Sequence, residues 1–196
     1  MESERPAPYR DAKRAGRDAV AVRLLELADG RLAAEGPSGL SMRRLANAAG
    51  CSTMVFYTAF GDKAGLTEAL AAREVDRWID AAVTHADPDP VAWLDATGRA
   101  LLALAAERPH HRDLVLAPPA VLGLGAAVRA AVGDAWAASV PGTNGADVAA
   151  AVWSAWRGAL AVGDDAVEAM RVHSGVVRLW SATLASATAT GNAVVP

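Results

Sequence analysis

The stretch from Ser41 to Leu66 constrains the fold of this chain more than any other feature. It contains two short helical patterns joined at Gly50. In the first pattern, apolar residues recur at the spacing that places them on one face of a helix: Met42, Leu45, Ala46 and Ala49. Gly50 can adopt the positive φ that ends a helix and turns the chain sharply. The pattern therefore predicts two short helices with a tight turn between them.

The second helix is predicted over residues 53–59, with Ser52 as its N-cap, and Ser41 is the N-cap expected for the first. Leu45 and Phe56 are expected to fill the space between the two helices. The inward positions are Cys51, Phe56 and Phe60, and the outward positions are Thr53, Met54, Val55 and Thr58. This layout is that of a helix-turn-helix.

An ordinary hairpin of two helices is the alternative interpretation. A solvated helix usually carries pairs of glutamate and lysine, whereas Thr53, Tyr57 and Thr58 leave this helix polar and nearly uncharged. Such a face suits the floor of the DNA major groove, where acidic groups would be repelled. The surface therefore favours DNA binding.

Residues from about 19 to 70 resemble the DNA-binding domain of the TetR family of bacterial transcriptional regulators. The shared features are an amphipathic helix that ends at Gly36, the run Ser41-Met42-Arg43 with Leu45-Ala46 and Ala49-Gly50, then Ser52, Phe56-Tyr57, Phe60, Asp62-Lys63 and Leu66. The resemblance implies an all-α protein: an N-terminal three-helix helix-turn-helix domain followed by a C-terminal helical bundle for ligand binding and dimerisation.

Composition agrees with this class. The 196 residues are 53% hydrophobic, 21% charged, rich in alanine and poor in aromatics, which favours helices over sheets. No apolar run is expected to span a membrane, the first residues lack a signal-peptide core, and the single Cys51 excludes an internal disulfide. We expect a cytoplasmic bacterial protein without metal or other cofactor. The net charge is −3, but residues 1–75 hold 11 basic against 10 acidic residues and residues 76–196 hold 8 against 12.

The predicted organisation has four parts. Residues 1–18 form a flexible basic arm that could lie along a phosphate backbone or in a minor groove, although Asp11 and Asp18 oppose this role. Residues 19–66 form the DNA-binding domain, residues 67–190 the ligand-binding and dimerisation domain, and residues 191–196 a tail.

Helices are predicted at 19–35, from Asp62 to about Val83, and over five later stretches. These are Val91–Glu107, Pro109–Leu116, Pro119–Ser139, Ala146–Val162 and Ala166–Ala187, with fraying after Thr188. Asp62 and Asp89 are expected to cap helices, and Pro141-Gly142 marks a turn. The last two helices are more apolar than one neighbour requires, which predicts a homodimer through a four-helix bundle.

The six tryptophans all follow the helix-turn-helix, where they either pack in the core or the dimer interface or line a ligand cavity. The run Trp153-Ser154-Ala155-Trp156-Arg157-Gly158 resembles the Trp…His-Gly signature of one class of TetR-family C-terminal domains, and the break at residues 106–110 is similar to one found there. This chain has Arg157 in place of the histidine, so the role of that histidine does not transfer. The ligand-binding residues predicted are Trp93, His110, Trp153 and Arg157.

The resemblance also implies a set of DNA contacts. Ser41, Tyr57 and Lys63 would bind phosphates, Arg43 would reach a base edge, and Thr53 and Val55 would approach bases. The full predicted set is Ser41, Arg43, Arg44, Ser52, Thr53, Met54, Val55, Tyr57, Thr58 and Lys63. Arg44 also suits a solvated face. Ala59 replaces a family residue that contacts phosphate, and Met54 replaces a smaller one.

The predicted function is a homodimeric repressor that a small-molecule effector releases from double-stranded operator DNA. One alternative is a helical dimer that binds a ligand or protein and has little DNA affinity. Catalysis would have to use His110-His111 with Asp113 or Asp164-Asp165, but no nucleophile, phosphate loop or metal-binding spacing accompanies them. We therefore predict that the protein is not an enzyme and has no catalytic residues.

Overall fold

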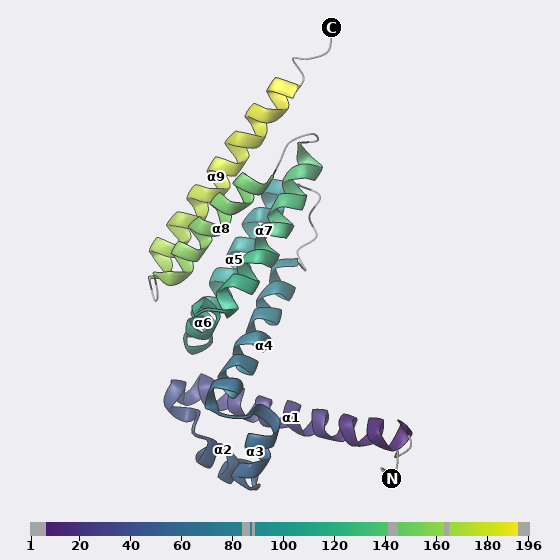
Figure 1. The fold of residues 1–196 in the computed structure, drawn as a ribbon. Coiled ribbons are helices and arrows are strands. Elements are labelled where there is room, and N and C mark those ends of the chain that lie inside the picture. The colour runs from purple at the N-terminus through teal and green to yellow at the C-terminus, as the bar shows by residue number, and fades with distance from the viewer. Residues whose placement is uncertain (1–6, 84–86, 88, 141–144, 163–164, 192–196) are drawn as a thin grey trace. The chain divides into compact units, whose positions relative to one another are not determined.

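The computed structural model describes residues 7–83, 87, 89–140, 145–162 and 165–191, and these are almost entirely helical (Figure 1). No strand occurs within these residues. The elements are α1 (Ala7–Glu35), the 3-10 turn η1 (Gly36–Gly39), α2 (Met42–Ala49), α3 (Thr53–Phe60), α4 (Lys63–Val83), α5 (Pro90–Glu107), α6 (Pro109–Leu116), α7 (Ala120–Ser139), α8 (Ala146–Ala161) and α9 (Ala166–Gly191). The all-α prediction is confirmed.

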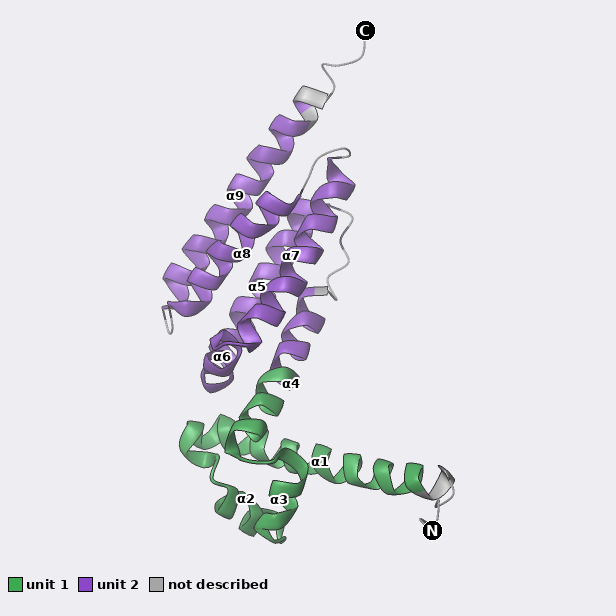
Figure 2. Cartoon of the chain, in the orientation of Figure 1, with its two compact units in different colours: residues 1–72 green, residues 73–196 purple. Residues whose placement is uncertain are grey.

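The chain divides into two compact units, residues 1–72 and residues 73–196 (Figure 2). The sequence placed this division after Leu66. It lies six residues later because the first turns of α4 belong to the core of the N-terminal unit, in which Leu66 and Leu70 are buried.

The N-terminal unit is built on one apolar stripe of α1. Leu24, Ala28 and Leu32 recur every four residues along this helix and are buried. They share the core with Leu40, Met42, Leu45, Ala46, Phe56, Leu66, Leu70 and Ala71. The short helices α2 and α3 are therefore held against α1 by apolar contacts on their inner faces.

The first helix begins much earlier than predicted. We expected it at Ala19 after a flexible arm, but α1 starts at Ala7. Pro8 lies in the first turn, where proline has no adverse effect because the N–H groups there have no partner within the helix. The alanine, lysine and arginine residues that follow are good helix formers. Residues 10–20 are all exposed, and residues 1–6 of the predicted arm lie outside the described residues.

The C-terminal unit is a helical bundle in which α5 packs against α9, and α8 packs against both α7 and α9. Five tryptophans are buried in its core: Trp78, Trp136, Trp153, Trp156 and Trp180. Trp136 and Trp180 meet edge to face, with ring centroids 5.1 Å apart. The small alanines of these helices let their backbones approach, and the indole rings fill the spaces that remain.

Most helix boundaries follow the signals in the sequence. Asp89 caps α5, its Oδ1 accepting a hydrogen bond from the Val91 N–H at 3.0 Å, and Asp165 caps α9 by accepting from the Glu168 N–H at 2.9 Å. The prediction that the chain frays after Thr188 was wrong, because α9 continues to Gly191. The predicted turn at Pro141-Gly142 and the tail beyond residue 191 lie outside the described residues.

Helix α7 is long and apolar enough to cross a membrane by length and composition alone, contrary to our expectation that no such segment exists. Most of its larger apolar side chains face the bundle, whereas Leu122 is 69% exposed. Val121, Leu124, Val128, Val132 and Trp136 are all buried in the core of the C-terminal unit. This burial is that of a core helix, and a single such segment is weak evidence for membrane insertion.

Gly98 lies where α5 packs tightly against His173 of α9. A Cβ at this position would lie 2.4 Å from ring atoms of His173 and 3.0 Å from Cζ2 of Trp156. Gly123 in α7 is different, because a Cβ there would meet no described atom within 4 Å. Both glycines lie within helices, so a change to alanine raises helix propensity at either position. Comparing the two changes therefore isolates the effect of packing at Gly98.

We predict that Gly98→Ala lowers the free energy of unfolding by about 1–3 kcal/mol, since overpacking outweighs the gain in helix propensity. Gly123→Ala is the matched control and should raise it by up to about 1 kcal/mol. Urea denaturation at one protein concentration measures both. A Gly98→Ala variant as stable as the Gly123→Ala variant would contradict the packing assigned to α5 and α9.

Candidate nucleic-acid interface

The turn between α2 and α3 forms as the glycine pattern predicts. Gly50 has φ of 65°, and its N–H donates to the carbonyl oxygens of Ala46 and Asn47. The Cys51 N–H donates to the Ala46 carbonyl oxygen at 3.0 Å. These bonds close the end of α2 and direct the chain into α3 within three residues.

Helix α3 has one face buried in the core of the N-terminal unit and the other exposed to solvent. Phe56 is fully buried, as is Leu45 on α2, whereas Met54 is 67% exposed and Tyr57 48% exposed. Thr58 is also exposed. The predicted outward positions are thus only partly right, because Thr53 and Val55 are half-buried. Val55 also lines a groove between α3 and α1, which pack against each other.

The two serines occupy the predicted N-cap positions, but neither makes a capping bond. Ser41 and Ser52 have extended backbones, and neither hydroxyl accepts a hydrogen bond from its helix. The amide groups in the first turns of α2 and α3 therefore lack the expected side-chain partner. Backbone N–H groups and a hydroxyl at a helix N-terminus can bind a phosphate oxygen.

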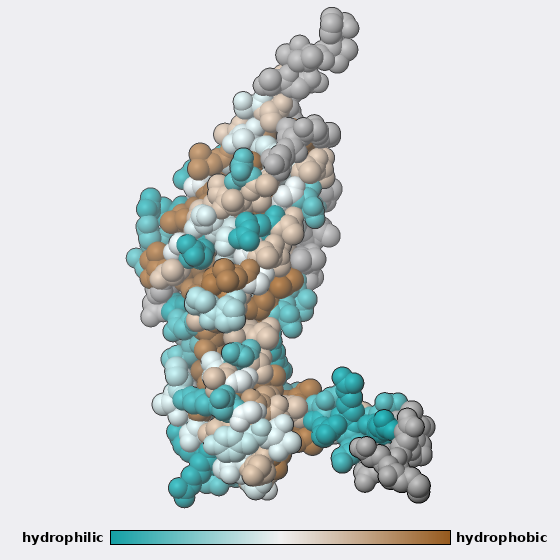
Figure 3. Space-filling model, viewed as in Figure 1, coloured by the Kyte–Doolittle hydropathy of each residue, from teal (hydrophilic) through white to brown (hydrophobic). Residues whose placement is uncertain are grey.

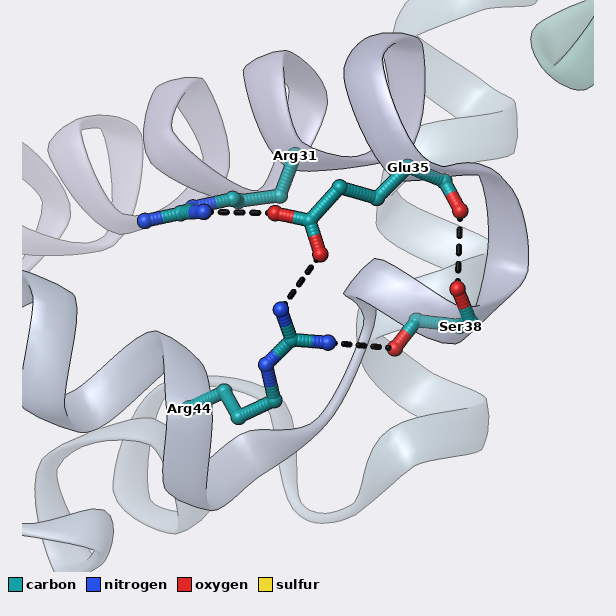
Figure 4. A network of polar contacts seen from close by, with 4 residues as sticks. All are labelled: Arg31, Glu35, Ser38 and Arg44. Carbon is teal, nitrogen blue, oxygen red and sulfur yellow. Dashed lines mark hydrogen bonds and ion pairs between the residues drawn. The ribbon is translucent and has the colours of Figure 1, made fainter.

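Two neighbouring arginines on α2 have different surroundings. Arg44 donates from Nη2 to Glu35 Oε2 at 2.5 Å and from Nη1 to the Ser38 carbonyl oxygen at 3.3 Å (Figure 4). Glu35 also accepts from Arg31 at 2.5 Å. Arg43 is exposed and makes no ion pair with any described residue. Arg44, which we included among the DNA contacts, thus joins α2 to the end of α1.

The same network shifts the titration of Glu35. The hydrogen bond from Arg31, followed by that from Arg44, holds the pKa of the Glu35 carboxyl below its ordinary value of 4.5. The carboxylate is therefore the form that the network stabilises. Its contribution to stability is present above pH 4.5 and is lost as the pH falls through the lowered pKa.

On the other side of α3, Asp62 begins α4. Its Oδ1 accepts a hydrogen bond from the Gly65 N–H at 2.9 Å, as the sequence predicted for a cap. Lys63 follows at the first helical position, is exposed, and makes no ion pair within the described part of the chain. Thr58 donates its hydroxyl proton to the Met54 carbonyl oxygen at 2.8 Å, so this hydroxyl can act toward a ligand mainly as an acceptor.

The four residues predicted to bind a ligand are dispersed over the C-terminal unit. Trp93 lines a cavity of about 310 Å³ between α5 and α7. Trp153 is buried against Gly125, His110 is half-buried on α6, and Arg157 is exposed on α8. Neither this cavity nor a second one between α5, α8 and α9 is lined by more than one of the four.

The structure reveals two polar clusters that sequence reasoning missed. His173 is fully buried, and its Nε2 lies 2.9 Å from Oδ1 of Asp95, whose Oδ2 accepts from Arg99 Nε at 2.8 Å. Arg99 and then His173 hold the pKa of the Asp95 carboxyl below its ordinary value. No sequence signal joins residues 78 positions apart. The only hint was that His173 has apolar neighbours on its helix, where a buried polar side chain needs a hydrogen-bond partner.

The second cluster surrounds Glu74, which is 1% exposed. Its carboxylate accepts a hydrogen bond from Trp78 Nε1 at 3.1 Å and forms ion pairs with Arg77 at 2.7 Å and Arg108 at 3.2 Å. These partners compensate a charge whose burial would otherwise be very unfavourable. The cluster joins α4 to the start of α6.

Comparison with known proteins supports the class that this geometry defines. Residues 24–70 match the family described as bacterial regulatory proteins, tetR family. Among solved structures, the chain is similar to a protein with unknown function from Rhodococcus sp. RHA1, with 27% identity, a TM-score of 0.61, and coverage of 82% of this chain and 91% of that one. It also shares the fold of a TetR-family transcriptional regulator from Pectobacterium atrosepticum, with 20% identity, a TM-score of 0.64, and coverage of 89% and 96%. No curated protein matches the chain.

A short turn closed at Gly50, an exposed uncharged helix after it and cations on either side define a helix-turn-helix DNA-binding protein. The matched segment covers this motif and the helix that supports it. Residues 24–70 therefore match the DNA-binding domain of the tetR family, and the chain shares the fold of a solved TetR-family transcriptional regulator.

The two arginines of α2 give a matched test of this description. We predict that Arg44→Ala lowers the thermal midpoint at pH 7, because it removes the link from α2 to Glu35, and that Arg43→Ala changes the free energy of unfolding by less than about 0.5 kcal/mol. Thermal denaturation followed by circular dichroism measures both. The deficit of the Arg44→Ala variant should shrink as the pH falls below 4.5 and Glu35 is protonated. Equal midpoints for the two variants at pH 7 would contradict the network.

Proposed function

We propose that this TetR-family regulator is a homodimeric repressor that binds operator DNA through α3 and leaves it when a small molecule binds the C-terminal unit. The observation that carries the proposal is the surface around α3. An exposed helix without charged side chains has an exposed arginine before it and an exposed lysine after it, and neither forms an ion pair within the described residues. Such a surface suits duplex DNA, in which the bases lie between two phosphate backbones.

In this proposal the polar groups divide into two sets. Ser41, Ser52, Tyr57 and Lys63 bind phosphates and orient the domain, which adds affinity without sequence preference. Arg43 donates two hydrogen bonds to a guanine edge. Thr53, Met54, Val55 and Thr58 approach the bases, the apolar members by contact with thymine methyl groups. Arg44 positions α2 and does not contact DNA.

The exposed apolar side chains of the C-terminal unit support a dimer. Leu179 and Val167 on α9 are 71% and 81% exposed, and Val162 at the end of α8 is 45% exposed. Pairing α8 and α9 with the same helices of a second copy would remove these side chains from water. Two copies would also present two α3 helices to successive half-sites.

Two cavities in the C-terminal unit are large enough for a small effector. One holds about 310 Å³ and is lined by Trp93, and the other holds about 440 Å³ between α5, α8 and α9 and is lined by Leu102, Leu160 and Met170. A molecule that binds one spacing of the two DNA-binding units better than the other would change operator affinity. We include a cytoplasmic location and the absence of enzymatic activity in the proposal, because TetR-family regulators act by binding DNA.

A helical dimer with little DNA affinity is the second candidate. It is favoured by the lack of an arginine, lysine, asparagine or glutamine on α3, by Ala59 in place of a phosphate-binding side chain, and by the internal hydrogen bond of Thr58. Selection of bound duplexes from a random pool, with wild-type protein, discriminates between the two candidates. Recovery of a two-fold symmetric sequence supports the repressor, and recovery of none supports the alternative.

Substitution of phosphate-binding residues and of the base-binding arginine should have different effects on DNA binding. Tyr57→Phe and Lys63→Ala should lower the affinity for the selected duplex and for a scrambled duplex of equal length by similar factors. Lys63→Ala should also reduce the slope of log K against log salt by about 0.9 for each subunit. Arg43→Ala should instead reduce the preference for one base pair in each half-site by about 1–3 kcal/mol. Fluorescence anisotropy titrations measure all three. An unchanged preference in the Arg43→Ala variant refutes its assignment.

The dimer prediction has a matched control on another helix. Leu179→Lys should convert the protein to a monomer, because it places charges where two copies of α9 meet, and should lower operator affinity at the same protein concentration. Leu122→Lys replaces a leucine that is 69% exposed on α7, outside the proposed interface, and should leave the dimer intact. Sedimentation equilibrium measures the mass of each variant. A dimeric Leu179→Lys variant would show that the interface lies elsewhere.

A further inference from the structure

A groove runs between the N-terminal half of α1 and helix α3. It holds about 390 Å³, and its lining includes Lys13, Arg17 and Val20 from α1 and Met54, Val55 and Thr58 from α3. Lys13 and Arg17 belong to the extra turns of helix that precede Ala19, and Val20 lies just after it. Figure 3 shows hydrophilic side chains gathered on this part of α1, with hydrophobic surface where the helix joins the rest of the N-terminal unit.

The basic and acidic side chains in the N-terminal half of α1 lie on different faces of the helix. Lys13 and Arg17 are four residues apart, lie on the face toward α3, and form no ion pair with described residues. At about 100° per residue, Asp11 and Asp18 lie about 100° or more around the helix from either cation. The acidic residues, which weigh against DNA binding when α1 is read as a flexible arm, therefore point away from the groove.

The floor of the groove is apolar. Val20 is 47% exposed and Met54 is 67% exposed, and both remain in contact with solvent in the isolated chain. Exposed apolar surface beside unpaired cations fits a ligand that has both an apolar and an anionic part. The sugar-phosphate backbone of DNA has this chemistry, with deoxyribose carbons next to phosphate oxygens.

The position of the groove identifies which ligand meets it. Met54 and Thr58 line the groove and also belong to the exposed face of α3 that we assign to the major groove. A duplex seated on α3 has one of its backbones directly beside that helix. Continuity with the DNA-binding face and a positive charge opposite phosphates favour this backbone over a protein segment.

We propose that the groove between α1 and α3 binds the backbone of one operator strand, with Lys13 and Arg17 on its phosphates and Val20 and Met54 against its deoxyriboses. This inference rests on the proposed function and extends the DNA contact beyond the helix-turn-helix. The N-terminal turns of α1 are then a rigid part of the binding surface and lengthen the contact along each half-site.

The test separates charge from apolar contact with matched variants of the full-length protein. The probes are the duplex that the wild-type protein selects from a random pool and a scrambled duplex of equal length. Lys13→Ala with Arg17→Ala should reduce the slope of log K against log salt by about 1.8 for each subunit, since each lost phosphate contact removes about 0.9. Arg14→Ala removes a cation of the same helix that does not line the groove, so its slope should stay close to wild type.

The apolar floor has its own control. Val20→Ser should raise Kd several-fold on both duplexes without changing the salt slope, whereas Val22→Ser, at an exposed valine outside the groove, should leave both unchanged. Circular dichroism should show wild-type helicity for all four variants, because alanine and serine are tolerated on an exposed helix surface.

Three outcomes distinguish the hypotheses. If the wild-type protein binds neither duplex, the proposed function itself fails. If it binds, but the double variant keeps the wild-type salt slope or loses no more of it than Arg14→Ala does, the groove is not a backbone site and the inference is overturned. If the groove variants change the mass of the free protein in sedimentation equilibrium, the groove holds a second copy of the chain, which also overturns it.

Discussion

The burial of Leu45 on α2 and of Phe56 on α3 is the constraint on which the helix-turn-helix depends. Helices α2 and α3 have eight residues each, far fewer than an isolated helix needs in water. They persist because each buries one large apolar side chain, fully excluded from solvent, between the two helices and α1. Burial of each such side chain contributes about 1.5–3 kcal/mol. The burial of Phe56 also determines which face of α3 remains in solvent.

Polar contacts between helices add to the attachment that the buried apolar side chains provide. Arg44 fastens α2 to the end of α1 through Glu35 and the Ser38 carbonyl, so the angle of the helix-turn-helix is defined at two separate points. In the C-terminal unit, the pair of buried His173 and half-buried Asp95 joins α9 to α5 in a similar way, near Gly98, where a Cβ would meet the His173 ring. In the second link only His173 is buried, because Asp95 stays in contact with solvent, whereas both partners of the first link are solvent-accessible.

Local signals were sufficient for most of the fold. Proline, glycine and aspartate mark the ends of most helices. The predicted bounds of α2, α5, α6, α7 and α8 agree with those in the structure to within about one residue. The start of α1 was missed because Pro6, Pro8 and a run of charges are typical of a disordered tail. A proline in the first turn is nevertheless compatible with a helix, and charged residues need no apolar partner when the helix is exposed.

Other features could not be predicted from local patterns. Arg43 and Arg44 are adjacent and chemically identical, and only the position of Glu35, eight or nine residues earlier on another helix, gives them different roles. The partner of His173 lies 78 residues away. Conventional helix periodicity also gives no sign of which cations of α1 face α3, because that depends on the packing of α1 rather than on its own composition.

The neutral surface of α3 has a consequence for how the whole N-terminal unit must work. Electrostatic attraction to phosphates supplies most of the affinity of a DNA-binding protein, and α3 has no cation with which to provide it. In the proposed complex, that attraction comes from the elements around α3: α1, the start of α2 and the start of α4. A binding surface spread over several helices keeps its shape only if those helices are rigidly joined, so the apolar core and the Glu35 network are requirements for affinity as well as for folding.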